Sequence, residues 1–385
     1  MFYTYNSVNK IVYGAGVVAQ TGELAKNLGI SRAIIVTDPS LAKLNLHKPV
    51  EDSLEAAGIA HCLFSDAELE PSTGSIENIA KQAIEFKAEL VIGLGGGSAL
   101  DSAKAACVLL TNEGPIEKYF GVNNVPNPCA PAFYIPTTAG TGSEVTSISV
   151  LADKTSGAKI GVVSDYMYAK AVILDPEMTI GLPPHVTAMT GVDAFVHAME
   201  SFVGKAATPF TDALNLQAMK LIARSIRKAY VNGGDVDART DMLYASCLAG
   251  MGFSNTQNGI IHAVGTAVPR AYNLPHGLLM ACLSPMCMEY NVMANPEKYA
   301  QIAEILGGEY HPDTLTMARQ APELMSELLQ DLDIKEGLVP YGVKEEDLEG
   351  IATRAVGAAR LMGNNPRPGT VAQVLKLLKE NHFEA

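Results

Sequence analysis

Short segments that are apolar throughout, separated by segments with helical periodicity, constrain the fold of this chain more than any other feature. Strands buried on both faces have this uniform apolarity, and intervening helices can cover both faces of a parallel sheet. The predicted strands are Arg32–Thr37, Glu89–Leu94, Ala132–Ile135 and Ala171–Leu174, with predicted helices over Ser75–Lys87 and Ser98–Leu110. The chain up to about Pro176 is therefore predicted to form an α/β domain with a parallel sheet.

The pattern changes after about Leu182, where nearly every segment has helical periodicity or length and no β-type run is found. Thr208 and Pro209 provide a capping hydroxyl and a proline at the first helical position, so a helix is predicted from there to about Tyr230. A chain of 385 residues is too long for one ordinary core. We therefore predict an α/β domain over residues 1–181 and an all-helical domain over residues 182–385.

Charge and cysteine content narrow the class of partner and compartment. The formal net charge is −13 and no basic cluster is present, which suits neither nucleic acid nor an anionic membrane surface. The six cysteines are scattered without a C-x-x-C pair, which indicates reduced thiols. Met1–Tyr5 lacks a secretory pattern, and the apolar stretch Gly277–Met288 is too short to span a membrane. We therefore expect a cytoplasmic protein.

A glycine turn, Gly95–Ser98, directly follows one predicted strand and precedes a predicted helix. Glycines let the backbone approach a phosphate closely, and a helix N-terminus supplies free N–H donors and a favourable dipole. Ser98 and Asp101 have capping-box spacing, so the helix is predicted to begin at Ser98, with Asp101 and Lys104 one turn apart on the same face. The alternative is a tight turn without a ligand.

A second stretch, Gly14–Ala19, fits the dinucleotide fingerprint G-x-G-x-x-A, and Lys10–Tyr13 before it can form a short strand. A glycine hairpin turn explains this stretch equally well. Asp38 lies at a suitable distance downstream to accept ribose hydroxyls, and its charge would repel the 2′-phosphate of NADP. For Asp38 the alternative is a helix N-cap or an Asx turn before Pro39.

A threonine-rich loop, Thr137–Glu144, follows the next predicted strand and consists mainly of glycines and small hydroxyl residues. Such residues can line a cofactor with hydrogen bonds and little bulk. A long surface loop rich in turn-forming residues is the alternative interpretation.

One carboxylate and three histidines in the helical half have the chemistry of a transition-metal site. Asp193 and His197 are four residues apart in a predicted helix, so both side chains lie on one face, one turn apart. With His262 and His276 they would suit Fe²⁺ or Zn²⁺ and give no support to Ca²⁺ or Mg²⁺. Each histidine, taken alone, also fits a hydrogen-bonded core residue. Spacing does not place His262 and His276 beside the other two.

Taken together, these segments resemble the iron-containing, or group III, alcohol dehydrogenase family. The resemblance covers essentially the whole chain, and the motifs occur in the family's order. The matching motifs are Gly95-Gly96-Gly97-Ser98-x-x-Asp101-x-Ala103-Lys104, Pro136–Glu144, Gly191-x-Asp193-Ala194-x-x-His197-Ala198-x-Glu200, His262-Ala263 and Pro275-His276-Gly277. The resemblance implies a dinucleotide-binding α/β domain with a parallel sheet followed by an all-α domain, in a dehydroquinate-synthase-like architecture.

The resemblance also implies two cofactors and the residues that hold them. Fe²⁺, with Zn²⁺ as an alternative, would be bound by Asp193, His197, His262 and His276. NAD(H) would be bound by Asp38 at the ribose, by Gly96, Gly97 and Ser98 at the pyrophosphate, by Thr137 and Thr138 in the threonine-rich loop, and by Lys159 near the nicotinamide ribose. Asp101 and Thr141, from the same two motifs, complete this expected set. Gly14–Ala19 is then not the phosphate turn.

The chain departs from the family pattern close to His262. Many members carry another histidine four positions after this residue, where this chain has Thr266. Because a hydroxyl does not buffer a proton near neutral pH, the proton relay is expected to run through Thr266, the cofactor ribose and water, or to be slower. Pro269 and Arg270 replace a pair of small residues. Arg270 either binds an anionic substrate group, such as a sulfonate or carboxylate, or forms a structural salt bridge.

The predicted function is iron-dependent, NAD(H)-linked interconversion of a small alcohol and its aldehyde, with His276 and Thr266 as the expected catalytic residues. The metal would polarise the alcohol or carbonyl oxygen while hydride passes to or from nicotinamide C4. A zinc-dependent polyol (glycerol-type) dehydrogenase is the nearest alternative. A metal-dependent hydrolase or lyase and a non-catalytic protein are more distant ones. The resemblance further implies a homodimer or larger assembly, and no fused aldehyde dehydrogenase activity is expected.

Overall fold

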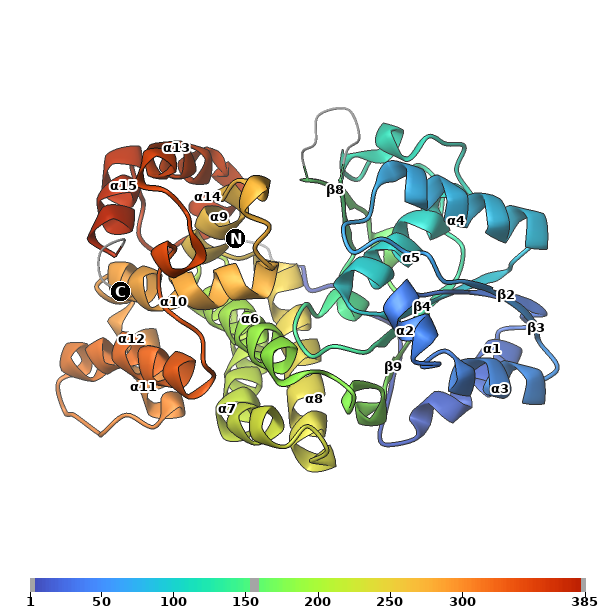
Figure 1. Cartoon of the computed structure of the whole chain (residues 1–385), viewed down its shortest axis with the longest axis horizontal. Coiled ribbons are helices and arrows are strands. Elements are labelled where there is room, and N and C mark those ends of the chain that lie inside the picture. The colour runs from blue at the N-terminus through green and yellow to red at the C-terminus, as the bar shows by residue number, and fades with distance from the viewer. Residues whose placement is uncertain (1–3, 153–158, 382–385) are drawn as a thin grey trace. The chain divides into compact units, whose positions relative to one another are not determined.

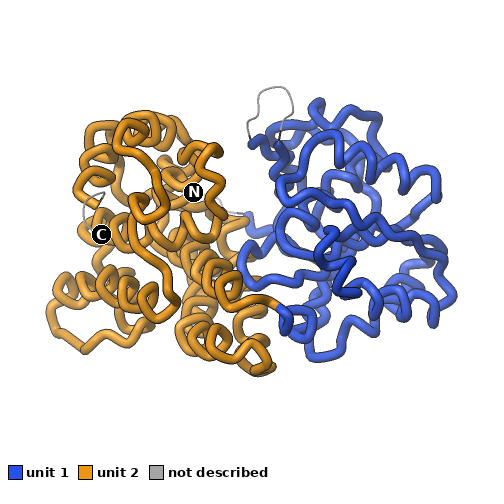
Figure 2. Tube along the Cα trace, viewed as in Figure 1, with its two compact units in different colours: residues 1–181 blue, residues 182–385 orange. Residues whose placement is uncertain are grey.

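The computed structural model describes residues 4–152 and 159–381, and the backbone falls into two compact units, Met1–Gly181 and Leu182–Ala385 (Figure 2). The first unit contains a six-stranded sheet in the order β1-β9-β6-β4-β2-β3, and every neighbouring pair in it is parallel. Its strands are β1 Ile11–Tyr13, β2 Arg32–Val36, β3 Ala60–Phe64, β4 Leu90–Gly95, β6 Ala132–Pro136 and β9 Ala171–Leu174. The prediction of a parallel sheet is confirmed.

Helices cover both faces of this sheet, which explains why its central strands are apolar throughout (Figure 1). On one face, Ile35 of β2 packs in a core cluster with Val50 and Leu54. On the other face, Gly93 of β4 leaves so little space that a Cβ atom there would lie 2.8 Å from Ala103 Cβ. The helices of this unit are α1 Thr21–Asn27, α2 Pro39–Lys43, α3 Lys48–Ala56, α4 Thr73–Phe86 and α5 Gly97–Leu109.

The strand order reverses between β2 and β4. From β2 the chain passes to β3 on one side, and then returns to place β4 on the other side of β2. The loops that follow β2 and β4 therefore diverge, and ligands of open α/β sheets bind at the crevice that such a reversal creates. Asp38 follows β2, and the glycine turn Gly95–Ser98 follows β4. The topology thus brings these two predicted cofactor segments to one place.

A second, three-stranded sheet in this unit was not predicted. It consists of β5 Gly121–Val122, β7 Ile148–Ala152 and β8 Lys159–Val163, with β7 and β8 antiparallel. These strands are short and only partly apolar, so they lack the uniform apolarity that identifies a strand buried on both faces. The edge strand β3 was missed for the same reason, because most of its residues are only half-buried.

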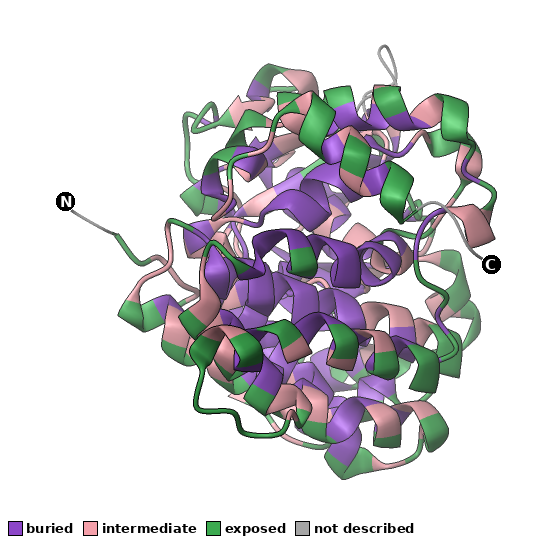
Figure 3. Cartoon of the chain, turned by 90° about the vertical axis from the view of Figure 1, so that its left-hand side faces the viewer, coloured by how far each residue is buried: buried purple, intermediate pink, exposed green. Residues whose placement is uncertain are grey.

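The second unit is helical, and no strand occurs in residues 182–381. In Figure 3, buried residues fill the interior helices, and exposed residues lie on the outer faces. The predicted helix start at Thr208 is confirmed, because Thr208 and Thr211 form a capping box. No helix in the described part of the chain is long and apolar enough to cross a membrane. The helices are α6 Pro184–Val203, α7 Pro209–Val231, α8 Val236–Thr256, α9 Ile260–Ala267, α10 His276–Val292, α11 Pro296–Leu306, α12 Thr314–Asp331, α13 Leu348–Gly357, α14 Ala359–Asn364 and α15 Val371–Glu380.

Candidate functional site

Three helices of the second unit bring one carboxylate and three imidazoles together. Asp193 and His197 lie one turn apart on α6, His262 lies on α9, and His276 is the first residue of α10. One potential ligand atom from each of these four residues lies within 4.8 Å of the others. We call this group the His/Asp cluster. Sequence spacing explained only the first pair, whereas the packing of α10 against α6 and of α9 against α10 supplies the other two.

Small residues and stacking fix the arrangement of the cluster. A Cβ atom on Gly277 would lie 2.7 Å from the carbonyl oxygen of Met189, so only glycine lets the start of α10 lie against α6 at this point. The His197 ring stacks on Phe253 of α8, with ring centroids 4.4 Å apart. The His262 ring centroid lies 4.6 Å from that of His197 and 5.4 Å from that of His276. The imidazoles are therefore held by packing as well as by their positions on the helices.

The polar atoms of the cluster fit a divalent transition metal. Asp193 Oδ1 and His262 Nε2 are buried without a hydrogen-bond partner, a costly situation that a metal ion would relieve. Burial raises the pKa of the Asp193 carboxyl, although His276 and His262 oppose this shift. One carboxylate and three imidazoles suit Fe²⁺ or Zn²⁺ better than Ca²⁺ or Mg²⁺. The His276 side chain is 41% exposed, so the cluster is open to solvent on that side.

Glu200, which the sequence analysis did not assign to the site, orients His262. Its Oε2 atom lies 2.7 Å from His262 Nδ1 and also accepts the Gly259 N–H, while Oε1 accepts the Ile261 N–H. A carboxylate on Nδ1 holds the proton there and leaves Nε2 as the ligand atom, as in other metal sites. Glu200 is seven residues after Asp193 on α6. A carboxylate two turns along the same face of an apolar helix was the signal that could have identified it.

Thr266 and Arg270 lie beyond His262 in the chain. The Thr266 hydroxyl donates a hydrogen bond to the His262 carbonyl oxygen at 2.7 Å, so its proton points back into α9. Arg270 is exposed on a short 3-10 helix, Arg270–Tyr272, that connects α9 to α10. Both residues thus lie on the segment between two cluster histidines. Their catalytic and substrate roles stay predictions.

In the first unit, the glycine turn has the form of a phosphate site. Gly96 is the N-cap of α5, and no side chain caps the helix. The prediction that Ser98 begins and caps this helix is wrong, because α5 begins at Gly97 and Ser98 Oγ donates to the Leu69 carbonyl oxygen instead. A helix N-terminus without a side-chain cap keeps its N–H donors for a ligand.

The threonine-rich loop packs directly on this turn. A Cβ atom on Gly97 would lie 2.8 Å from Thr141 Cγ2, and one on Gly96 would lie 3.4 Å from Thr138 Cγ2. The Thr137 N–H donates to the Gly95 carbonyl oxygen at 3.0 Å. Most residues of the loop are buried, so the interpretation of this segment as a surface loop is wrong. The two glycine-containing segments form one structure at the end of β4 and β6.

Both interpretations of Asp38 are compatible with its geometry. Its Oδ1 atom accepts the N–H groups of Ser40 and Leu41, so Asp38 is the N-cap of α2. Its Oδ2 atom lies on the side of the glycine turn, 3.8 Å from where a Cβ atom on Gly95 would lie. One oxygen thus caps a helix while the other faces the predicted phosphate site.

In the rival stretch Gly14–Ala19, backbone N–H groups already donate to a side chain of the protein. Asp175 accepts the Gly16 N–H with one carboxylate oxygen and the Val18 N–H with the other, at 3.1 and 3.0 Å. The second half of the stretch lies in a 3-10 helix, Val17–Gln20, and the α-helix α1 begins only at Thr21. Because an internal carboxylate already fills the place of a phosphate, this stretch acts as a structural turn.

Asp101 and Lys159 form contacts within the protein. Asp101 accepts hydrogen bonds from the Ser143 hydroxyl, the Val150 N–H and the buried ammonium of Lys104. Its carboxylate therefore fastens the threonine-rich loop and β7 to α5. Lys159, at the start of β8, forms an ion pair with Glu70 at 3.1 Å. Neither contact tests the cofactor roles predicted for these two residues.

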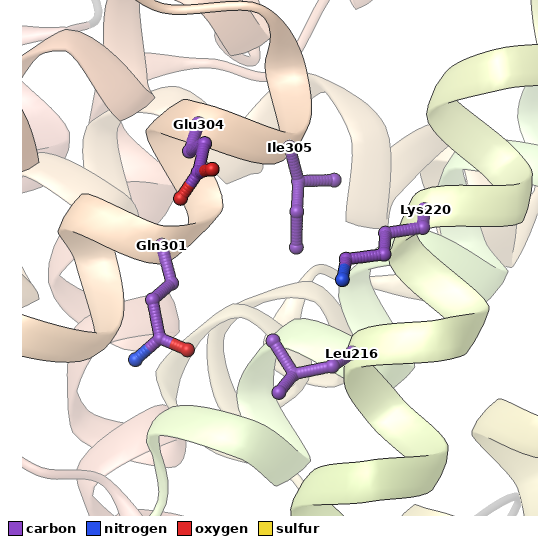
Figure 4. Close-up of a pocket in the computed structure, with 5 residues that line it drawn as sticks. All are labelled: Leu216, Lys220, Gln301, Glu304 and Ile305. Atoms are coloured by element: carbon purple, nitrogen blue, oxygen red, sulfur yellow. The ribbon is translucent and has the colours of Figure 1, made fainter. Parts of the chain in front are cut away.

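A separate hollow of about 280 Å³ lies between α7 and α11, and Figure 4 shows side chains of both helices around it. Lys220 and Glu304 are its charged residues. It includes no residue of the His/Asp cluster and no histidine or cysteine. We therefore assign the candidate site to the cluster and to the glycine turn, where the donor chemistry is found.

Comparison with known proteins identifies the family. Residues 8–176 match the model described as iron-containing alcohol dehydrogenase, and residues 187–382 match the model described as the C-terminal part of the Fe-containing alcohol dehydrogenase family. A sulfoacetaldehyde reductase of Bilophila wadsworthia is 56% identical over 388 residues, which span 100% of both chains. An NAD-dependent methanol dehydrogenase of Bacillus methanolicus is 36% identical and covers 96% of this chain and 97% of its own.

Solved structures show the same architecture. A 1,3-propanediol oxidoreductase, 34% identical, superimposes with a TM-score of 0.96 over 99% of this chain and 100% of its own. A sulfoacetaldehyde reductase from Bifidobacterium kashiwanohense in complex with NAD+ is 26% identical and has a TM-score of 0.89 over 99% of both chains. These matches confirm the predicted fold class and the predicted enzyme class. The chain belongs to the family of iron-containing alcohol dehydrogenases.

Proposed function

We propose that this enzyme reduces sulfoacetaldehyde with NADH, using a divalent metal held by the His/Asp cluster. The observation that carries the proposal is the cluster itself, in a chain that is 56% identical over its whole length to a sulfoacetaldehyde reductase. Aldehyde reduction needs an electrophilic group at the carbonyl oxygen and a hydride donor. The cluster and the glycine turn are suited to hold the two cofactors that meet these needs.

Asp193, His197, His262 and His276 would hold the metal, and Glu200 would keep the Nε2 lone pair of His262 directed at it. When bound, the metal supplies Lewis acidity toward the carbonyl oxygen, and NADH supplies the hydride. The exposed side of His276 leaves room for a small substrate to approach the cluster. Formation of the product alcohol also requires a proton, and Thr266, on the same helix as His262, would act as the relay.

On the cofactor side, the uncapped N-terminus of α5 would receive the pyrophosphate of the dinucleotide. Thr137 and Thr138 lie in the loop beside it. The Asp38 carboxylate near Gly95 favours a ribose with free hydroxyls and repels a 2′-phosphate. These features support NAD(H) over NADP(H). The solved sulfoacetaldehyde reductase from Bifidobacterium kashiwanohense, with NAD+ bound, has the same fold.

The sulfonate of the substrate would be bound by Arg270. This exposed cation lies in the connection between the helices that carry His262 and His276. A planar guanidinium can donate two parallel hydrogen bonds to a sulfonate, as it does to carboxylate and phosphate. In a chain with a net charge of −13, a positive residue at this place is informative.

Six free cysteine thiols are in keeping with a reducing, cytoplasmic setting, and the enzyme is expected to act as a homo-oligomer.

The test is anaerobic NADH oxidation by the Fe²⁺-loaded enzyme with sulfoacetaldehyde, acetaldehyde and glycolaldehyde at matched concentrations. We expect kcat/KM to be highest for sulfoacetaldehyde. Equal or higher kcat/KM for the neutral aldehydes would remove the substrate assignment while leaving the dehydrogenase assignment intact. If none of the three aldehydes supports NADH oxidation, both the substrate assignment and the dehydrogenase assignment are wrong.

The Arg270→Gln variant tests the sulfonate contact independently of the reduction of the aldehyde group. We expect kcat/KM for sulfoacetaldehyde to fall by about 10- to 100-fold, the range for losing a charge-assisted hydrogen bond, while acetaldehyde is little affected. Arg224→Gln is the matched control, because Arg224 pairs with Asp241 on helices that carry no cluster residue. An equal loss for both aldehydes would show that Arg270 has a structural role instead.

A further inference from the structure

The N-terminus of α9, the helix that carries His262, is capped by residues from distant parts of the chain. Gly259 is its N-cap and has no side chain to accept hydrogen bonds. Three consecutive N–H groups nevertheless have partners: Gly259 and Ile261 donate to Glu200, and Ile260 donates to Asn365 Oδ1 at 3.2 Å. A helix start normally leaves such donors for a local cap or water. Here Asn365 lies 105 residues further along the chain.

Asn365 is itself held by a reciprocal amide pair with Asn291 of α10. Asn291 Nδ2 donates to Asn365 Oδ1 at 3.0 Å, and Asn365 Nδ2 donates to Asn291 Oδ1 at 2.8 Å. A further hydrogen bond joins Asn365 Nδ2 to the Arg367 carbonyl oxygen. Both asparagines are almost fully buried, at 1% and 2% exposure. Buried amides with all partners satisfied fix a unique geometry, because any displacement leaves polar groups unpaired.

This pair links two of the helices that carry cluster histidines. Asn291 is on α10, which begins at His276, and Asn365 contacts the start of α9, two residues before His262. The fit around Gly259 is close: a Cβ atom there would lie 2.8 Å from Asn365 Oδ1 and 3.2 Å from Glu200 Oε1. Movement of Asn365 would therefore shift the backbone donors that orient the Glu200 carboxylate against His262.

We propose that Asn365, supported by Asn291, is a positioning residue for the metal site, which sets the placement of His262 through the N-terminus of α9. The proposal rests on the proposed metal-binding role of the His/Asp cluster. The hydrogen bonds of the two asparagines go to Ile260, to each other and to Arg367, and not to the donor atoms of the metal ligands. Their effect is on the geometry of the site and the affinity for the metal, as is typical of residues that support metal ligands.

The test is a titration of metal-free enzyme with Co²⁺. The visible absorption of bound Co²⁺ monitors the titration and reports the geometry of the ligands. Asn365→Ala removes the acceptor for the Ile260 N–H, and Asn291→Ala leaves that acceptor but removes its support. We expect the Co²⁺ Kd to rise about 10- to 100-fold in the first variant and less in the second, with altered absorption bands in both. Should Asn365→Ala not fold, Asn291→Ala decides alone.

Asn112→Ala is the control, because Asn112 is a buried asparagine of the first unit with its own backbone partners. We expect it to lower the melting temperature without changing Co²⁺ affinity or absorption. Unchanged Co²⁺ affinity and spectrum in both test variants, with only a lower melting temperature, would overturn the positioning role. Failure of the unmodified enzyme to bind Co²⁺ would instead overturn the metal site on which the proposal rests.

Discussion

The His/Asp cluster of the helical unit and the glycine turn of the α/β unit illustrate two ways of preparing a binding site. The cluster is made of side chains, and two of its donor atoms are buried without hydrogen-bond partners. The glycine turn is made of backbone groups, and its important property is that no side chain caps the start of α5. A site made of side chains depends on the packing of its helices. A site made of backbone groups depends on room for the ligand at the helix start and on the strand order of the sheet.

The contrast explains why we expect different roles for Gly14–Ala19 and Gly95–Ser98, although both are rich in glycine. Asp175 fills the first turn with its own carboxylate. The second turn lies beside the reversal of strand order, and no side chain caps the helix that follows. A glycine pattern therefore indicates a phosphate site only where the topology leaves its donors accessible.

The largest effect is expected when the His/Asp cluster loses one of its metal-binding side chains. His276→Ala should reduce turnover by about a thousandfold or more, since Lewis acidity at the carbonyl contributes several kcal/mol. Metal content by elemental analysis should fall in parallel, while NADH affinity stays unchanged. His185→Ala, an exposed histidine at the start of α6, is the control. Retained metal and turnover in the His276 variant would break the assignment of the cluster.

A smaller effect is expected when the same site loses the partner of a ligand. Glu200→Gln keeps the shape of the side chain but removes the charge at His262 Nδ1, so metal affinity should fall about 10- to 100-fold. Competition with a chromophoric chelator measures this change. An affinity equal to that of the unmodified enzyme would mean that packing alone positions His262.

The backbone site should respond to added bulk. Gly97→Val places atoms within 2.8 Å of Thr141 and crowds the start of α5, so the NADH Kd should rise about tenfold or more. Fluorescence titration with NADH measures it, and metal affinity should not change. Gly181→Val, at a position with nothing within 4 Å, is the control. If NADH binds normally to the Gly97 variant, the phosphate lies elsewhere.

The last effect concerns stability and not binding: in the threonine-rich loop, burial raises the pKa of Glu144 to about 7. Because the folded-state pKa exceeds the unfolded value, this group stabilises the fold below pH 4.5, and the contribution is lost as pH rises through about 7. The full shift corresponds to roughly 3 kcal/mol. As the pH rises from 5 to 8, the melting temperature of the Glu144→Gln variant should therefore increase relative to that of the unmodified protein. The exposed Glu77→Gln should not, and a parallel response of the two variants would contradict the buried-carboxyl account.

Much of the fold was predictable because it depends on local pattern. Uniformly apolar strands identified the main sheet, and the Thr208 cap identified a helix start. Ser98 was mistaken for a cap because its actual partner, Leu69, is 29 residues away in the sequence. The strands β7 and β8 lack the uniform apolarity of the central strands.

The candidate site was predictable in part and for a different reason. Residue spacing indicated Asp193 and His197 as a pair, and residue type made His262 and His276 candidates, but only the family resemblance joined them into one site. Neither source identified Glu200 or Asn365, because their roles arise from contacts with the start of α9 that are formed only in the folded chain. The roles of the site residues therefore stay predictions, which the variants above test.

The most direct test of a metal-dependent reductase is the metal dependence of the hydride transfer itself. The purified enzyme would be stripped of metal with a chelator, and NADH oxidation by sulfoacetaldehyde would be followed anaerobically as Fe²⁺ is added back. We expect no oxidation in the stripped enzyme, recovery that saturates at one Fe²⁺ per chain, and no recovery in the His276→Ala variant. Oxidation at an undiminished rate in the stripped enzyme would contradict it.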